Sequence, residues 1–444
     1  MKQLTRSTRL PETRTAYYRQ LLWLAGALLL STPLFGATCA TTPALPDCSP
    51  WVATWGTAMV DAGSNNSPDL SEQTLRMVVH TSVGGPQVRI WLSNRFGTVP
   101  VRIESAHVAL SAESNPAGSG DVSAIQPQTD RAVTFDHLSS VVLAPGATIV
   151  SDPVSLQVPA LSNMAVSLYL PERTIGDTIH GGANQTAYAI PGNLVDAPVI
   201  PSNAWTRNSW YFLTGVDVYA PGSSAVVAYG DSITDGNHST LNANHRWPDY
   251  LAARLAADDA TRKSGILGMV NTGISGNRVL LDGDGPNALA RLDWDVLSRS
   301  GVRYLILFHG INDIEFDTRF RQPYRDLVKR LAAGLTQITT QAHDHGIRVI
   351  GATQMPDCHP PQCTWPEGEV VRNVLNQWIR TTDVFDGVID FDQITRDPEH
   401  ITFLWSKYNS GDYVHPNDVG YKAMSDAIDL TLLTRPSSKA PHLH

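Results

Sequence analysis

The second half of the sequence predicts a three-layer, flavodoxin-like α/β domain with a five-stranded parallel sheet, and the first half predicts an all-β, jelly-roll-like sandwich. From about residue 223, short apolar runs alternate with helical segments, which is typical of a parallel sheet covered by helices on both faces. Between about residues 51 and 219, short runs alternate apolar and polar residues, and Pro or Gly interrupts them every ten residues or so. No long amphipathic helix is expected in that first half.

Length and composition limit the class of protein. With 444 residues, the chain is too long for one ordinary domain. Its 42% hydrophobic and 17% charged residues exclude a disordered chain and a polytopic membrane protein. The net charge of −9 comes without a basic stripe, so nucleic acid is not an expected partner. We predict a signal peptide at 1–40, the β-sandwich at 41–222, the α/β domain at 223–436 and a disordered tail at 437–444.

The N-terminal segment has the layout of a secretory signal peptide. Basic residues precede an apolar run at Leu21–Ala37, which Pro33 interrupts, and small residues follow at Thr38–Ala40. An uncleaved anchor and a lipid anchor on Cys39 are the alternatives. We therefore expect a secreted or periplasmic protein without a stable membrane span once the signal is removed.

The cysteines suit an oxidising compartment. Four residues separate Cys358 from Cys363, which predicts a local disulfide in an exported protein. Half of a metal site is the alternative, but a second pair of ligands is missing. Cys48 can pair with Cys39 only if the signal is cleaved before Cys39.

Strand-like runs fill the first half. Thr74–Val83 and Gln87–Ser93 alternate in polarity on either side of Gly84-Gly85, which predicts a β-hairpin. The same pattern continues at Val101–Leu110, Ser140–Leu143, Ala147–Val150 and Met164–Tyr169.

The second half supplies the elements of a parallel sheet. The expected strands are Ala225–Tyr229, Ile266–Val270, Tyr304–Phe308, Val349–Thr353 and Gly387–Phe391. The expected helices are Pro248–Ala257, Asn287–Ser298, Tyr324–His343, Glu369–Thr381 and Asp418–Thr434. Right-handed crossovers between such strands place helices on both faces of the sheet.

Polar loops follow the first three of these strands. They are Gly230–Ile233, Asn271–Arg278 and His309–Asp313, and a fourth polar segment, Gly411–Asn417, follows the last strand. Carboxyl ends of neighbouring parallel strands share one edge of the sheet, which is where such folds keep their ligands. We therefore expect the first three loops to converge on one crevice, with the fourth free to fold over it.

These loops contain what acyl transfer requires: a nucleophile, a base, a group that orients the base, and donors for an oxyanion. Ser232 is the candidate nucleophile and His415 the candidate base. Asp412, three residues before His415, can hold its ring. The candidate oxyanion donors are the backbone N–H groups of Ser232 and Gly276 and the side-chain amide of Asn312. The mechanism needs no cofactor and no metal.

Four blocks in this order resemble the SGNH (GDSL) hydrolase superfamily. They are Gly230-Asp231-Ser232, Gly276, Gly310–Asp313 and Asp412–His415, and the resemblance covers roughly residues 223–435. The first block continues with Ile233 where the family most often has leucine. The resemblance implies an esterase or lipase that works by the serine mechanism without a metal.

A looser resemblance concerns the first half. Trp51–Gly56, Gln73–Arg76 and Leu92–Gly97 resemble the β-domain that precedes some secreted bacterial SGNH hydrolases grouped near xylan-associated acylesterases. This resemblance implies carbohydrate esters as a substrate class.

Neighbouring residues have supporting roles in this hypothesis. Asp231 and Asp313 are expected to brace their loops, and Asn277 and Arg278 flank the second block. Arg278 has two open uses, a contact with the substrate or a surface salt bridge.

The sequence thus predicts a secreted serine esterase that removes short acyl or acetyl groups from a small-molecule or polysaccharide ester. A lipase or lysophospholipase acting on longer acyl chains is the alternative within enzymes. A carbohydrate-binding surface protein with an inactive hydrolase domain is the alternative from another class.

Overall fold

The computed structural model describes residues 49–434 except 64–66, 113–121, 321–325 and 364. The described residues all belong to one compact unit. The predicted signal peptide, Cys39, Cys48 and the tail at 437–444 lie outside the described residues. Within the described ranges, no helix combines the length and the apolar character that a membrane crossing requires.

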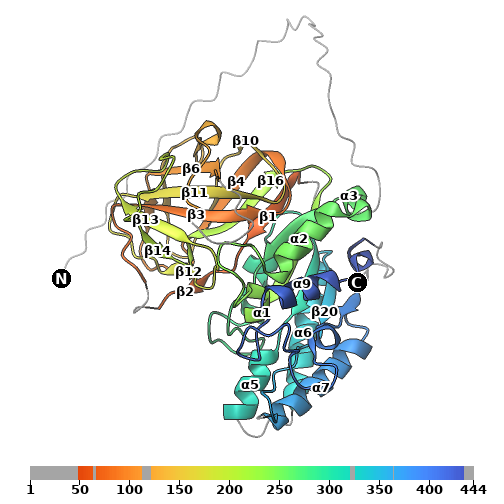
Figure 1. Ribbon diagram of the computed structural model, residues 1–444. Coiled ribbons are helices and arrows are strands. Elements are labelled where there is room, and N and C mark those ends of the chain that lie inside the picture. The colour runs from red at the N-terminus through yellow and green to blue at the C-terminus, as the bar shows by residue number, and fades with distance from the viewer. Residues whose placement is uncertain (1–48, 64–66, 113–121, 321–325, 364, 435–444) are drawn as a thin grey trace, which may run out of the picture. The chain divides into compact units, whose positions relative to one another are not determined.

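Two antiparallel sheets dominate the first half (Figure 1). One has the order β1-β16-β4-β10, with β9 also paired to β4; its strands are β1 (Trp51–Gly56), β16 (Leu213–Tyr219), β4 (Gly85–Ser93), β10 (Val154–Val158) and β9 (Thr148–Val150). The other has the order β14-β13-β3-β11-β6-β7; its strands are β14 (Trp205–Arg207), β13 (Ala187–Pro191), β3 (Gln73–Thr81), β11 (Ser162–Leu170), β6 (Ser105–Leu110) and β7 (Arg131–Val133). Smaller sheets join β15 (Trp210–Tyr211), β12 (Thr178–His180) and β2 (Val60–Asp61), and β5 (Val101–Ile103) with β8 (Val141–Leu143); a short 3-10 turn, η1 (Pro127–Thr129), precedes β7.

The predicted hairpin around Gly84-Gly85 is wrong. Strands β3 and β4 lie in different sheets, so this turn carries the chain from one sheet to the other. The two glycines serve close backbone approach: a Cβ on Gly84 would lie 2.5 Å from the carbonyl oxygen of Val158, and one on Gly85 would lie 2.6 Å from that of Tyr219. Glycine permits both a tight hairpin turn and such a crossing, so the sequence pattern does not distinguish them.

The second half forms the predicted five-stranded parallel sheet, in the order β18-β17-β19-β20-β21. The strands are β17 (Ser224–Gly230), β18 (Ile266–Asn271), β19 (Val302–Phe308), β20 (Arg348–Ala352) and β21 (Gly387–Ile389). In chain order this is 2-1-3-4-5, the flavodoxin-like arrangement. Burial is complete along β17, as its unbroken apolar run requires in a sheet covered on both faces.

Helices cover this sheet. They are α1 (Ser232–Asp235), α2 (Trp247–Ala257), α3 (Asp259–Ser264), α4 (Ala288–Leu292), α5 (Ile311–Phe320), α6 (Leu327–Asp344), α7 (Pro366–Thr381), α8 (Phe391–Thr395) and α9 (Asp418–Asp426), with shorter helical turns at η2 (Asp293–Leu297) and η3 (Leu430–Leu433). The sequence did not predict α5, and the helix expected over Asp418–Thr434 ends at Asp426 before η3 begins.

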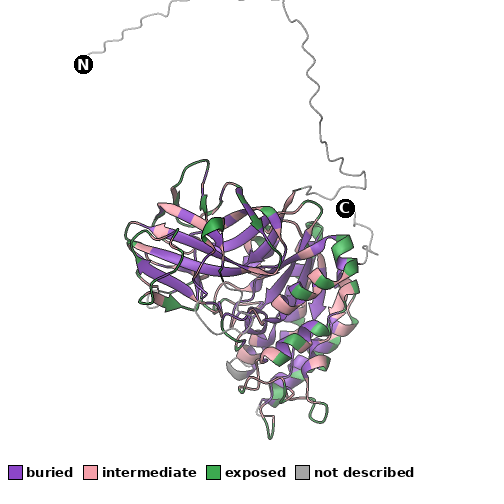
Figure 2. Ribbon diagram, turned by 45° about the horizontal axis from the view of Figure 1, so that its top comes forward, coloured by how far each residue is buried: buried purple, intermediate pink, exposed green. Residues whose placement is uncertain are grey.

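One hydrophobic core extends through both halves. Val52 on β1 and Leu92 on β4 belong to the same buried cluster as Val270 on β18 and Leu305 on β19. Figure 2 shows buried residues along the strands of both halves and exposed ones on the outer faces of the helices. The halves therefore pack as one unit, and the division into two domains at residue 222 stays a prediction.

Candidate active site

Ser232 lies where β17 ends and α1 begins. Asp231 caps this short helix by accepting a hydrogen bond from the backbone N–H of Ile233 at 3.2 Å. Gly230 permits the tight turn, because a Cβ there would lie 2.5 Å from the carbonyl oxygen of Phe308. The strand end thus fixes the serine at the carboxyl edge of the sheet, with 7% of its surface exposed.

The loop before α9 brings His415 and Asp412 to this serine. His415 Nε2 lies 2.8 Å from Ser232 Oγ, and His415 Nδ1 lies 2.6 Å from Asp412 Oδ2. The predicted nucleophile, base and acid therefore form one continuous hydrogen-bonded relay, although 183 positions of sequence separate Ser232 from His415. This geometry allows proton transfer from the serine hydroxyl to the imidazole.

The Asp412 carboxylate is held in place by its own loop. Its Oδ1 accepts hydrogen bonds from the backbone N–H groups of Val414 at 2.9 Å and His415 at 2.8 Å. Burial alone would raise the pKa of Asp412, but the hydrogen bonds from the His415 side chain and from these backbone groups outweigh burial and lower the pKa below its usual range. Asp412 is therefore ionised at neutral pH and can stabilise a positive charge on the His415 ring.

Candidate oxyanion donors come from the neighbouring loops. Asn312, in the first turn of α5, donates one amide hydrogen to the carbonyl oxygen of Asn277 at 3.0 Å, which ties the second and third polar loops together. The loops that carry Ser232 and Gly276 are joined by a hydrogen bond from Ile274 N–H to the carbonyl oxygen of Gly230 at 3.2 Å. A carboxamide has two hydrogens, and among the described residues no acceptor is seen for the second one of Asn312, so it can serve a ligand.

Backbone conformation and a close neighbour both favour glycine at position 276. Its φ is +75°, which lies in the left-handed region, and a Cβ would lie 2.1 Å from Asp284 Oδ2. The group that a side chain at position 276 would crowd is therefore the carboxylate of Asp284.

A buried arginine that was not expected from the sequence underlies two of the three strand-end loops. The Arg291 guanidinium donates to the carbonyl oxygens of Gly230 at 2.9 Å and Thr272 at 2.7 Å, and to Asn277 Oδ1 at 3.0 Å. Asp295 balances its charge at 2.8 Å, with both side chains buried. Arg291 thus links the Ser232 turn to the Gly276 loop from below.

Asn277 and Asp313 hold these loops through hydrogen bonds to their backbone. The Asn277 amide donates to the carbonyl oxygens of Asp284 at 3.1 Å and Pro286 at 2.8 Å. Asp313 accepts hydrogen bonds from the backbone N–H groups of Val279 at 2.7 Å and Leu280 at 2.9 Å.

Burial dominates the electrostatics of the two bracing carboxyls. It raises the pKa of Asp231 to about 7 and that of Asp313 to about 6, and their mutual repulsion adds to the effect on Asp231. One oxygen of Asp231 has no hydrogen-bond partner among the described residues. Asp231 is therefore a structural carboxyl that prefers to stay neutral.

A stability prediction follows from Asp231. Its folded-state pKa lies above the unfolded value near 4, so its contribution to stability is present at acidic pH and is lost as pH rises through about 7. We expect Asp231→Asn to remove this loss, which is on the order of 4 kcal/mol for a shift of this size. Chemical denaturation of wild type and variant at acidic, neutral and alkaline pH measures the difference.

Asp258→Asn is the control, because Asp258 also caps a short helix but is only half-buried. A wild-type pH dependence that survives in Asp231→Asn would contradict the prediction.

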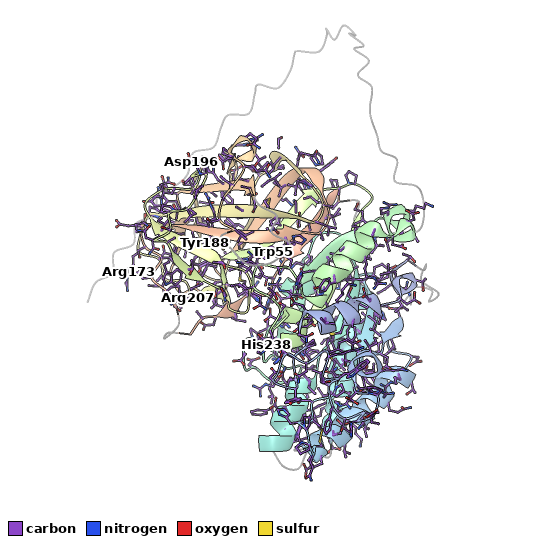
Figure 3. The ribbon with its side chains drawn as sticks, viewed as in Figure 1. Trp55, Arg173, Tyr188, Asp196, Arg207 and His238 are labelled. Atoms are coloured by element: carbon purple, nitrogen blue, oxygen red, sulfur yellow. A yellow bond between two sulfur atoms is a disulfide. The ribbon has the colours of Figure 1, made fainter. Side chains whose placement is uncertain are left out.

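His238 is a second histidine at the relay, and sequence inspection missed it. Its Nε2 lies 3.2 Å from Asp412 Oδ2, and its ring centroid lies 5.4 Å from that of His415. Half of its side chain is exposed, and it is labelled near α1 in Figure 3. Its backbone φ is +64°, in the left-handed region. His238 therefore forms part of the rim of the site.

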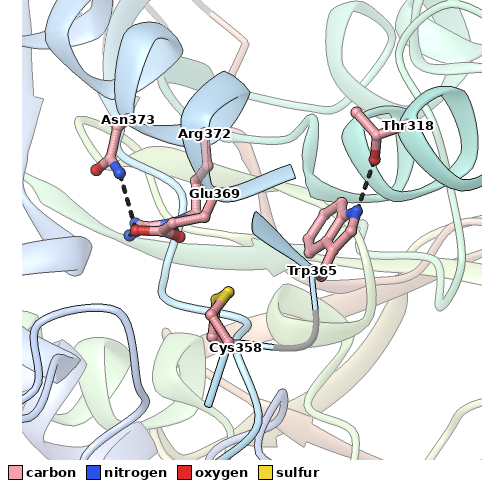
Figure 4. Close-up of a disulfide and its surroundings, with 7 residues drawn as sticks. Thr318, Cys358, Trp365, Glu369, Arg372 and Asn373 are labelled. Carbon is pink, nitrogen blue, oxygen red and sulfur yellow. Dashed lines mark hydrogen bonds and ion pairs between the residues drawn. A yellow bond between two sulfur atoms is a disulfide. The ribbon is translucent and has the colours of Figure 1, made fainter. Parts of the chain in front are cut away.

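The remaining predicted residues lie around the site. Arg278 stacks on Phe316 at 4.2 Å and donates to the carbonyl oxygen of Asp282, so its guanidinium serves its own loop in this structure. Cys358 and Cys363 form the predicted disulfide (Figure 4). His359, inside that disulfide loop, lies 5.6 Å from the Tyr413 ring between centroids, so the disulfide holds a loop that borders the relay.

The family match agrees with the motifs of the second half. Residues 226–428 match the family described as GDSL-like Lipase/Acylhydrolase. No curated protein matches the chain significantly. Solved structures with similar folds include a GDSL-like lipase from Bacteroides thetaiotaomicron (20% identity, 47% of this chain and 88% of that one, TM-score 0.34). They also include an acetyl xylan esterase from Geobacillus stearothermophilus (21%, 48% and 95%, TM-score 0.36) and a carbohydrate acetylesterase from Sinorhizobium meliloti (16%, 46% and 96%, TM-score 0.34).

The flavodoxin-like sheet and the matched region define a carboxylic ester hydrolase. Within this class, residues 226–428 match the GDSL-like lipase/acylhydrolase family.

Proposed function

We propose that the chain is an exported serine esterase that removes short acyl groups, above all acetyl, from carbohydrate alcohols. The observation that carries the catalytic part of this proposal is the relay Ser232–His415–Asp412, with its distances of 2.8 and 2.6 Å. In this proposal residues 41–222 form a β-sandwich domain and residues 223–436 the catalytic domain, after removal of a signal peptide at 1–40.

The reaction proceeds in two halves. His415 takes the proton of Ser232 Oγ as this oxygen attacks the ester carbonyl, and the backbone N–H groups of Ser232 and Gly276 and the Asn312 amide stabilise the oxyanion. His415 then protonates the leaving alcohol. Water, activated by the same imidazole, hydrolyses the acyl-enzyme and restores Ser232. Asp412 holds the ring and stabilises its positive charge throughout.

Polar surroundings favour a short acyl group on a polar alcohol. The side chains that border the relay include His238, Asn312, Tyr413 and His359, which can hydrogen-bond to or stack on a sugar ring. Export is supported by the disulfide between Cys358 and Cys363, which persists in oxidising compartments.

A substrate series tests this proposal. We expect kcat/KM to be highest for p-nitrophenyl acetate and propionate and to fall by roughly tenfold or more towards octanoate, because polar side chains near the relay offer added methylenes little apolar surface to bury. Release of acetate from acetylated xylan tests the carbohydrate part, with Ser232→Ala protein as the blank. A maximum at long acyl chains would favour the lipase alternative instead, and binding of xylan without hydrolysis of any ester would favour the inactive carbohydrate-binding alternative.

A further inference from the structure

The β-rich half reaches the candidate active site at one buried ionisable pair. His180, the last residue of β12, places its Nε2 2.9 Å from Oδ1 of Asp235, the last residue of α1. Both residues are 3% exposed. Figure 1 shows α1 at the side of the α/β half where β2 and β12 lie. A side chain of one half therefore contacts the very helix that begins with Ser232.

Both ring nitrogens of His180 are engaged. Nδ1 faces the carbonyl oxygen of Ala58 at 2.8 Å, and a carbonyl only accepts, so Nδ1 donates. Asp235 Oδ2 accepts hydrogen bonds from the backbone N–H of Ser275 at 3.1 Å and from its hydroxyl at 2.8 Å. Both carboxylate oxygens of Asp235 and both ring nitrogens of His180 thus take part in hydrogen bonds, and the Trp210 ring stacks on His180 with 5.5 Å between the centroids.

The partners of Asp235 are the two segments that catalysis has to hold together. Asp235 closes the helical turn of Ser232, whose carbonyl oxygen accepts from Gly236 N–H at 2.9 Å. Ser275 directly precedes Gly276, a candidate oxyanion donor. One carboxylate thus connects the nucleophile helix with the oxyanion loop, and His180 fixes that carboxylate from the β-rich half.

We propose that His180 is a positioning residue, which through Asp235 sets the distance between Ser232 and the Gly276 loop. The β-rich half then acts as a structural component of the active site, independently of any polymer it binds. This inference depends on the proposed function, because it assigns catalytic roles to Ser232 and Gly276. Its physical basis is that displacing reacting groups by about 1 Å can reduce a rate about 100-fold.

Neighbouring contacts in the same segment reinforce the connection. Asn184 Nδ2 donates to the carbonyl oxygen of Gly236 at 2.5 Å. Arg246 donates to the carbonyl oxygen of Asp235 at 3.0 Å and to that of Ala183. Residues 180–184 therefore contact several residues of the segment that follows Ser232.

Two adjacent glycines provide a matched test that removes no polar group. A Cβ on Gly182 would lie 2.5 Å from Asp235 Oδ2, whereas a Cβ on Gly181 would meet nothing closer than 3.9 Å. Neither glycine has a positive φ, so alanine suits the backbone at both positions. We expect Gly182→Ala to lower kcat about 10- to 100-fold on p-nitrophenyl acetate with KM within about threefold, and Gly181→Ala to match wild type.

Replacing His180 itself provides the second arm. We expect His180→Ala to lower kcat about 100-fold and to slow labelling of Ser232 by an organophosphate to a similar degree, at a temperature at which the variant is folded. His180→Gln retains a donor for Asp235, so its kcat should lie between that of His180→Ala and wild type. His107→Gln is the control, because His107 pairs with Asp130 at 2.8 Å inside the β-rich half; it should lower stability and leave kcat unchanged.

The outcomes separate this inference from the proposed function. If Ser232→Ala keeps full activity, the catalytic assignment itself fails. If Ser232→Ala is inactive while Gly182→Ala and His180→Ala keep wild-type kcat and lose only thermal stability, the pair is merely structural and the inference is overturned. Because the glycine arm retains every hydrogen-bonding group, it decides the question even if His180→Ala does not fold.

Discussion

Replacing Ser232 by alanine is expected to reduce kcat on short-chain esters by about 10⁶-fold, the loss that follows when the nucleophile is removed from a serine relay. The Ser232 hydroxyl makes its hydrogen bond to His415 at 2.8 Å. Its removal therefore leaves the fold intact, and the melting temperature should change little. Steady-state hydrolysis of p-nitrophenyl acetate and labelling by an organophosphate measure the loss.

Ser239→Ala is the matched control for this experiment. Ser239 has the same 7% exposure as Ser232 and follows it closely in the chain, but its hydroxyl lies 3.2 Å from the amide of Asn184, away from His415. Its alanine variant should retain activity and organophosphate labelling. Activity of Ser232→Ala within tenfold of wild type would show that another group is the nucleophile.

The sequence predicted the location of the site because strand ends carry it. Three polar loops follow buried strands, and the parallel sheet necessarily brings them to one edge. The D-x-x-H spacing of Asp412 and His415 is local, so their contact was also predictable. Tertiary folding alone brings this pair to Ser232 across 183 positions, and only the order of the motifs suggested that contact.

Residues that depend on packing between distant segments escaped prediction. Arg291 resembles an ordinary helical arginine in the sequence, yet its buried guanidinium donates hydrogen bonds to two of the strand-end loops. His180 and Asp235 come from different halves of the chain, and no periodicity relates them. The hairpin predicted at Gly84-Gly85 was wrong because glycine permits both a hairpin and a crossing between sheets. Patterns in the sequence specify elements well, but they do not specify which distant side chains meet beneath them.

Asp412→Asn is expected to reduce kcat by about 10⁴-fold while the loop keeps its shape. The two backbone N–H groups of Val414 and His415 hold Oδ1, so the asparagine carbonyl takes that place and its NH₂ group takes the place of Oδ2. This NH₂ group can only donate to His415 Nδ1, which then has to be the unprotonated nitrogen. The proton of the ring moves to Nε2, the nitrogen that faces Ser232 Oγ, and the imidazole can no longer accept the proton of the serine.

A neighbouring pair offers a close control for this substitution. Asp418 Oδ2 lies 2.7 Å from His245 Nδ1, at an exposure similar to that of Asp412, without contact to Ser232. Asp418→Asn should keep kcat near the wild-type value. The defect of Asp412→Asn is a wrong tautomer of His415, so KM should stay within about threefold of the wild-type value. Its kcat should recover in part at higher pH only if hydroxide takes over the role of the base. A kcat loss below tenfold would mean that His238, 3.2 Å from the same oxygen, or another group can orient His415 without Asp412.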